Sequence, residues 1–157
     1  MNSLKQKNNR ILVVDDEVDV LEFVRIYLES MGWEVKATSS VAEAFEELAK
    51  LPYFLVITDI AMPEMDGYEF INAIKTLGYG CQFALMTGFG YNPKHTLVKI
   101  YKTVKYPCLF KPFNREKVSM AVKEAYDLYH QDIGDGEVGG GGGDGEVGGN
   151  GNTNSGS

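Results

Sequence analysis

The sequence Phe54-Leu55-Val56-Ile57 is apolar throughout and is followed directly by Thr58 and Asp59. An apolar run of this length without alternation predicts a strand covered on both faces, as in a parallel sheet. Shorter or similar β-prone runs occur on either side of it. The expected strands are residues 11–14, 34–37, 54–57, 83–86 and 108–110.

Segments with a helical period of apolar residues separate these runs. The first begins at Val18 and ends before Gly32, a residue suited to the position after a helix. Ser40 and Glu43 form a capping-box pattern at the start of the second. The other three helices are expected after residue 67, over residues 93–102 and after the cap Asn114. The last of them has an apolar stripe that comprises Val118, Ala121, Val122, Ala125 and Leu128. The alternation predicts an α/β fold, a doubly wound five-stranded parallel sheet with five helices.

The chain length of 157 residues suits one domain, which we expect over residues 10–131 after a polar N-terminal extension, residues 1–9. Of the 18 glycines, 12 lie between Gly134 and Gly156. Residues 132–157 include five acidic and no basic residues. Such a segment buries too little apolar surface to offset its ordering entropy, so the sequence predicts a flexible acidic tail.

The composition argues against several classes of protein. The net charge is −7, and residues 1–131 carry 15 basic against 17 acidic residues, a net −2, which disfavours nucleic-acid binding. No apolar run has the length of a membrane span, and residues 1–10 lack a signal-peptide pattern, so we expect a cytoplasmic location. The two cysteines, Cys81 and Cys108, lie in apolar runs and are expected as buried thiols.

Polar residues follow four of the five expected strands. Asp15 and Asp16 follow the first, Asp59 the third, Thr87 the fourth and Lys111 the fifth. Because ligands of such sheets bind at the carboxyl ends of the strands, these side chains are expected at one rim. Taken singly, Thr87 fits a strand-ending turn, Lys111 a solvated lysine, and the aspartate pair an N-cap of the first helix.

Three neighbouring carboxylates need a counter-charge, because like charges raise one another's pKa. Mg²⁺ prefers carboxylate, water and phosphate oxygens, and together with Lys111 it would balance the three negative charges. A site of this kind suits phosphoryl transfer, with one carboxylate as the nucleophile. Asp59 is the best candidate, because Asp15 and Asp16 then remain to hold the metal.

The segment Asp59-Ile60-Ala61-Met62-Pro63-Glu64-Met65-Asp66-Gly67, with the polar residues at the other strand ends, closely resembles the receiver domain of bacterial two-component response regulators. The resemblance covers about residues 10–129. It implies a flavodoxin-like fold with strand order 2-1-3-4-5. It also implies a signalling domain rather than an enzyme, apart from self-phosphorylation and slow autodephosphorylation.

The resemblance implies a role for each site residue. Asp59 would accept a phosphoryl group from a histidine kinase or a histidine phosphotransfer protein. Mg²⁺ would be held by Asp16, Asp59 and the backbone carbonyl of Ala61, with Asp15 acting largely through water. Lys111 and Thr87 would contact the phosphoryl oxygens, and the Lys111–Pro112 bond would be cis.

Two positions depart from the family pattern. Cys108 stands where receiver domains usually place a switch aromatic, with Tyr106 two residues upstream, and Gly88 stands where the family usually has alanine. The expected partner face is the fourth helix, fifth strand and fifth helix. The basic residues expected on this face are Lys94, Lys99, Lys102 and Lys105, with His95 among them. They would either bind an acidic downstream protein or form an ordinary solvated face.

Three functions remain open. The first is a stand-alone receiver that switches its binding surface when phosphorylated. The second is a magnesium-dependent phosphohydrolase with an aspartyl nucleophile, although Ala61 occupies the position of the second acid that such enzymes use. The third is a degenerate receiver that binds partners without phosphate.

Overall fold

The protein was analysed as a computed structural model, which describes residues 8–88 and 106–142, with side chains described up to residue 131. Five parallel strands form one sheet in the order β2-β1-β3-β4-β5. The predicted fold class and strand order are therefore confirmed. The strands are β1 (Arg10–Val14), β2 (Glu34–Thr38), β3 (Leu55–Asp59), β4 (Gln82–Thr87) and β5 (Cys108–Phe110).

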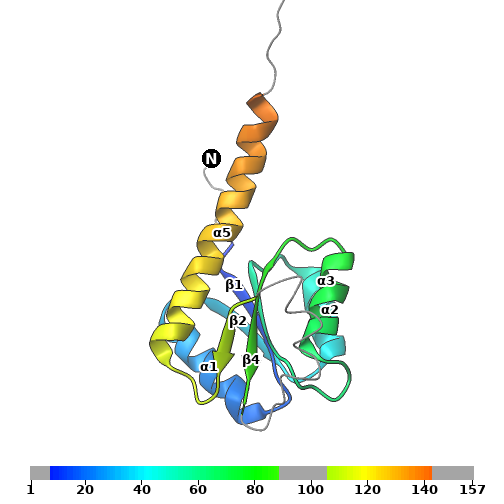
Figure 1. Cartoon of the computed structure of the whole chain (residues 1–157), viewed down its shortest axis with the longest axis vertical. Coiled ribbons are helices and arrows are strands. Elements are labelled where there is room, and N and C mark those ends of the chain that lie inside the picture. The colour runs from blue at the N-terminus through cyan, green and yellow to red at the C-terminus, as the bar shows by residue number, and fades with distance from the viewer. Residues whose placement is uncertain (1–7, 89–105, 143–157) are drawn as a thin grey trace, which may run out of the picture.

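Helices cover both faces of this sheet (Figure 1). They are α1 (Val18–Ser30), α2 (Val41–Lys50), α3 (Gly67–Thr76) and α5 (Arg115–Gly142). The helix expected over 93–102 lies outside the described residues, as do Lys94, His95, Lys99, Lys102 and Lys105. Within the described ranges, no helix is long and apolar enough to cross a bilayer.

The core consists of two apolar clusters, one on each face of the sheet. Along β1, Leu12 and Val14 point to the cluster beneath α2 and α3, whereas Ile11 and Val13 point to the cluster beneath α1 and α5. Successive side chains of a strand point to opposite faces, so a strand buried on both sides must be apolar at every position. This explains the unbroken apolar runs in β1 and β3.

The helix boundaries follow from local capping. Gly32 follows α1 with a positive φ of 98°, as expected for the residue after a helix. The Ser40 side chain accepts a hydrogen bond from the Glu43 N–H (3.1 Å) and caps α2. The predicted reciprocal bond is absent, because the Glu43 carboxylate accepts from the Thr38 hydroxyl instead. Asn114 caps α5 by accepting from the Lys117 N–H.

Other expectations need correction. Val18 and Leu128, both expected on buried stripes, are exposed, while Leu21, Val24, Val118 and Val122 are buried. The buried stripe of an amphipathic helix covers only about a third of its circumference. Val18 and Leu128 lie outside this stripe.

The last helix runs further than the sequence predicts. The backbone of α5 continues to Gly142, into the glycine-rich segment that was expected as a flexible tail from residue 132. A helix that is already nucleated adds one hydrogen bond per residue, and no proline interrupts this segment. At the other end, the expected N-terminal extension is partly attached to the domain, because His130 Nε2 lies 3.0 Å from the carbonyl oxygen of Asn8. The division into extension, domain and tail stays a prediction.

Candidate functional site

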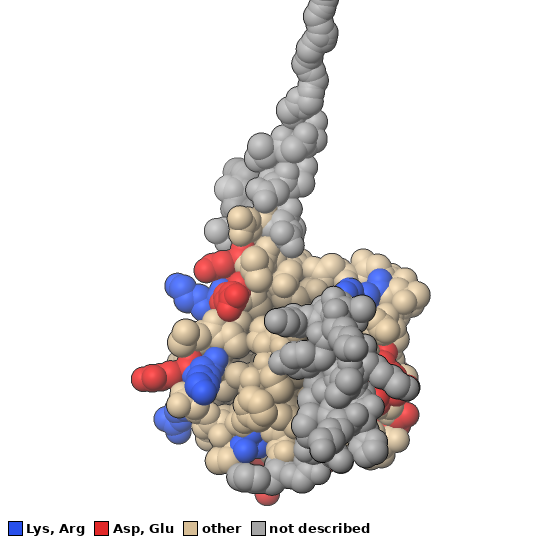
Figure 2. All heavy atoms as spheres, in the orientation of Figure 1, with Lys and Arg blue, Asp and Glu red and all other residues tan. Residues whose placement is uncertain are grey.

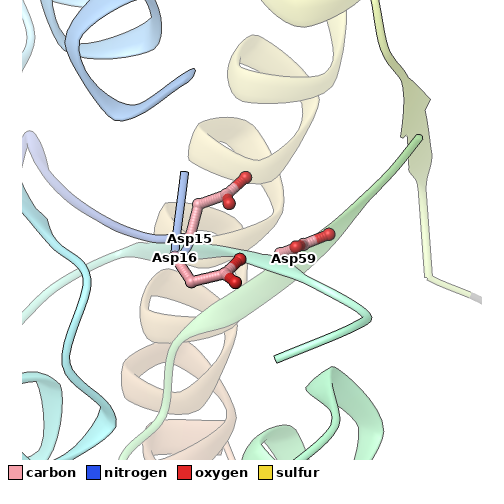
Figure 3. Close-up of side chains that lie close together, drawn as sticks. All are labelled: Asp15, Asp16 and Asp59. Atoms are coloured by element: carbon pink, nitrogen blue, oxygen red, sulfur yellow. The ribbon is translucent and has the colours of Figure 1, made fainter. Parts of the chain in front are cut away.

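Three carboxylates lie together at the carboxyl ends of adjacent strands (Figure 3). Asp15 and Asp16 follow β1, and Asp59 ends the neighbouring strand β3. One oxygen of each lies within 4.8 Å of one oxygen of the others. The predicted cluster is confirmed, and it could hold a metal ion.

Burial makes this cluster electrostatically unfavourable without a cation. Asp15 and Asp59 are buried and Asp16 is exposed. The pKa of Asp59 is raised to about 6, mainly by desolvation and also by the charges of Asp15 and Asp16, while Lys111 opposes the shift. Desolvation also raises the pKa of Asp15, despite its contact with Lys111. Hard oxygen donors with a surplus of negative charge fit a hard divalent cation.

Lys111 supplies the nearest positive charge among the described residues. Its Nζ lies 2.8 Å from Asp15 Oδ2 and 3.7 Å from Asp59 Oδ1, and it donates a hydrogen bond to Glu17 Oε1 at 2.6 Å. Burial alone would lower the pKa of Lys111, but the bonds to Asp15 and Glu17 outweigh it and the pKa is raised. The Lys111–Pro112 bond is cis, as expected.

Glu17 is a site residue that the sequence analysis missed. Its side chain contacts Lys111, 94 positions further along the chain. The sequence offered only a weak signal, a third consecutive acid after Asp15 and Asp16. The structure also decides the capping alternative for that pair. Glu17 is the N-cap residue of α1 and its own side chain makes no cap bond, while Asp15 Oδ1 accepts from the Glu17 N–H.

Thr87 ends β4 beside the acidic cluster, because β4 pairs with β3. Its side chain is buried, and its hydroxyl has no hydrogen-bond partner among the residues that the structure describes. Buried hydroxyl groups are normally hydrogen-bonded, and an unpaired one costs about 1–3 kcal/mol. This hydroxyl is therefore free to accept or donate a bond to a ligand at the rim.

The substitution Thr87→Val is expected to stabilise the unmodified, metal-free protein by about 1 kcal/mol, because it removes an unpaired buried hydroxyl. Thr58→Val is the matched control, since the Thr58 hydroxyl is buried and donates to the Asp59 carbonyl oxygen (3.0 Å). The control should lose about 1 kcal/mol. Urea unfolding in EDTA measures both. Equal destabilisation of the two variants would contradict the assignment.

The loop between β3 and α3 is held by backbone and capping bonds. The Asp66 side chain accepts from the Glu69 N–H, and the Glu69 side chain accepts from the Asp66 N–H, a complete capping box. The Gly67 N–H donates to the carbonyl oxygen of Ile60 at 2.8 Å. Ala61, expected to offer a carbonyl ligand, follows Ile60 and is exposed. The capping box fixes the start of α3, and the Gly67 bond connects it to the residue that follows β3.

Tyr106 lies away from the rim. Its hydroxyl accepts from Lys75 Nζ (3.1 Å), and its ring packs against Phe83, near the start of β4. Thr87 is at the other end of the same strand, so Tyr106 and Thr87 are separated along the length of β4. Cys108, in the expected aromatic position, is half-buried and pairs with Leu85 in the sheet register. In this conformation Tyr106 therefore does not replace the switch aromatic next to Thr87. Gly88 leaves ordinary contact space, because an added Cβ would lie 3.5 Å from Lys111 Cδ.

Comparisons with known proteins show the family of this chain. The family model of the response regulator receiver domain matches residues 11–123. The transcriptional regulatory protein ZraR of Klebsiella oxytoca is 30% identical over 128 residues, 82% of this chain and 28% of the relative. The response regulator receiver protein CpdR of Brucella abortus is 36% identical over 80 residues, 51% of this chain and 67% of the relative. The chain thus spans less than a third of the length of ZraR.

Solved structures show the same architecture. A CheY-like response regulator receiver domain protein from Methanospirillum hungatei aligns with a TM-score of 0.70 at 26% identity, covering 80% of this chain and 98% of that one. A receiver domain protein from Clostridium thermocellum aligns with a TM-score of 0.67 at 28% identity, covering 78% and 97%. The acidic cluster, the fold and the family match lead to one conclusion: this chain belongs to the response regulator receiver domain family of two-component systems.

Proposed function

We propose that the protein accepts a phosphoryl group on Asp59 from a histidine kinase or a histidine phosphotransfer protein, in a Mg²⁺-dependent reaction. One observation carries the proposal: the Asp59 carboxylate lies buried beside two further carboxylates and 3.7 Å from the Lys111 ammonium. An environment of this kind has the oxygen ligands for a divalent cation and a fixed positive charge for a phosphoryl group.

The chemistry is a substitution at phosphorus. An Asp59 oxygen forms a bond to phosphorus as the P–N bond of a phosphohistidine breaks, and the imidazole leaves with the electron pair and takes a proton from water. Mg²⁺, held by Asp16, Asp59 and the Ala61 carbonyl, with Asp15 acting through water, would neutralise charge on the phosphoryl oxygens. Lys111 stabilises the same oxygens from the β5 side.

Thr87 is proposed to bind the product. Its hydroxyl is buried at the end of β4 without a partner among the described side chains, so a phosphoryl oxygen on Asp59 would satisfy it. Movement of Thr87 toward Asp59 would pull the segment that follows β4. We propose that this displacement changes the surface offered to a downstream protein.

The proposed partner face includes β5 and α5, together with the expected helix that lies outside the described residues. Phe110, Met120 and Leu128 on these two elements are exposed although they are large and apolar. Figure 2 shows uncharged side chains over the middle of the view, and acidic and basic side chains interspersed at its left. A mixed charge pattern of this kind suits a protein partner better than nucleic acid. We also propose that signalling takes place in the cytoplasm.

Incubation with Mg²⁺ and acetyl phosphate tests the proposal. The acetyl P–O bond breaks, acetate leaves, and the intact mass is expected to rise by one phosphoryl group. Asp59→Asn should show no gain, and EDTA should prevent the gain in the wild-type protein.

The same experiment separates the alternatives. Rapid donor consumption without a mass gain would identify a phosphohydrolase, although Ala61 offers no acid for that reaction. No modification and no consumption would identify a degenerate receiver, and either result would overturn the proposal.

A further inference from the structure

The ammonium group of Lys111 is committed to residues other than the proposed phosphoacceptor. It donates to Glu17 Oε1 at 2.6 Å and lies 2.8 Å from Asp15 Oδ2. Its distance to Asp59 Oδ1 is 3.7 Å, which is too long for a hydrogen bond. An ammonium group has three donors, and the hydrogen bond to Glu17 directs one of them away from Asp59.

Glu17 occupies an unusual place for this contact. It is the N-cap residue of α1, where Ser, Thr, Asp and Asn are favoured because their side chains bond to the first helical N–H groups. The Glu17 side chain makes no such cap bond and reaches Lys111 instead. Its backbone is fixed by the N–H that donates to Asp15 Oδ1 at 2.8 Å. A local rule of helix capping is thus broken in favour of a contact with a site residue, which is typical of functional positions.

The contact can also be released at small cost. The Glu17 side chain is 60% exposed, whereas that of Lys111 is 13% exposed. Exposed ion pairs are weak, because water screens the charges and the long side chain loses freedom when it is held. A phosphoryl group on Asp59 would therefore compete effectively with Glu17 for the Lys111 ammonium.

We infer that Glu17 is a positioning residue, which holds Lys111 off Asp59 in the unmodified protein and competes with the incoming phosphoryl group for it. The inference rests on the proposed phosphorylation of Asp59. Glu17 thus sets how readily the site is phosphorylated without taking part in the bond change.

The test compares the rate of acyl phosphate formation from acetyl phosphate and Mg²⁺ in the wild-type protein and Glu17→Gln. The variant is expected to react faster by a factor of about 1.5 to 5, the range that corresponds to an exposed ion pair. Asp19→Asn is the matched control, because it removes one exposed negative charge from the first turn of α1. The control should change the rate much less.

A second background separates positioning from a general structural effect. In Lys111→Met, the Glu17→Gln substitution should leave the residual rate unchanged, because the ammonium that Glu17 holds is gone. Without donor or metal, a double-mutant cycle of Glu17→Gln and Lys111→Met should give a coupling factor of about 1.5 to 5 in the unfolding equilibrium constant.

The outcomes distinguish this inference from the proposed function. If the wild-type protein takes up a phosphoryl group but Glu17→Gln reacts no faster than Asp19→Asn, the inference alone is wrong. The same holds if the gain persists in Lys111→Met. If the wild-type protein takes up no phosphoryl group, both are wrong.

Discussion

Asp59→Asn is expected to stabilise the metal-free protein at pH 7.5, although it removes the proposed phosphoacceptor. Desolvation and the charge of Asp15 raise the pKa of Asp59 to about 6, against an ordinary value of 3.8. The folded state therefore disfavours the ionised carboxylate. A shift of about two pKa units corresponds to at most about 3 kcal/mol, and partial access of water reduces the expected gain to about 1 to 2 kcal/mol.

The pH dependence of this gain follows from its sign. Because the folded-state pKa is raised, the folded protein binds more protons than the unfolded chain between about pH 4 and pH 6. The contribution of Asp59 to stability therefore falls as the pH rises through that window. Asparagine does not ionise, so the difference between the variant and the wild-type protein should be small at pH 4 and complete above pH 6.

Urea unfolding in EDTA across this pH range measures the effect. Asp127→Asn on the exposed surface of α5 is the control and should change the free energy of unfolding by less than about 0.5 kcal/mol. Saturating Mg²⁺ should stabilise the wild-type protein more than Asp59→Asn, because the variant lacks one proposed ligand. An asparagine variant that is less stable than the wild-type protein at pH 7.5 in EDTA would contradict the electrostatic account.

The parts of the site that the sequence predicts are those that a parallel sheet brings together. Once residues 11–14 and 54–57 are assigned to strands buried on both faces, the residues that follow them must lie at one rim. The placement of Asp15, Asp59 and, after residues 108–110, Lys111 at this rim is therefore predictable from the sequence. It depends only on strand direction, which the alternation of strands and helices determines.

The contacts that the sequence did not predict depend on side-chain direction or on loop geometry. An exposed glutamate at a helix N-cap, such as Glu17, can point to solvent or across the rim, and only the position of Lys111 decides between them. Tyr106 lies two residues before Cys108, yet its distance from Thr87 follows from where β5 pairs with β4. The helix α5 is longer than the sequence predicts, because the glycine-rich composition was judged as that of an isolated segment. In the structure this segment continues a helix that packing has already formed.

Gly67→Ala is expected to give the largest loss of stability of these variants, about 2 to 3 kcal/mol. A Cβ at this position would lie 2.5 Å from the carbonyl oxygen of Asp59, 3.1 Å from the Cα of Ile60 and 3.2 Å from Leu85 Cδ2. The two nearest atoms belong to the backbone at the end of β3, so relief of the clash requires that this strand end or the start of α3 moves.

That movement should also impair the proposed phosphorylation. The Gly67 N–H bonds to the Ile60 carbonyl, so displacement of Gly67 also shifts the residue next to Asp59. A misplacement of about 1 Å at a reacting group can reduce a rate by two orders of magnitude. We expect acyl phosphate formation on Asp59 to fall at least roughly tenfold in Gly67→Ala, measured by intact mass after a short incubation with Mg²⁺ and acetyl phosphate.

Gly80→Ala provides the control, because the same methyl group would meet no atom within 4 Å and the φ of Gly80 lies outside the left-handed region that favours glycine. The change from glycine to alanine at a compatible position reduces the entropy of the unfolded chain and stabilises a protein by about 0.4–1 kcal/mol. Gly80→Ala should therefore be neutral or slightly stabilised and should react at the wild-type rate. If Gly67→Ala behaved in the same way, the end of β3 would be able to yield, and the fixed placement of Asp59 by this loop would be wrong.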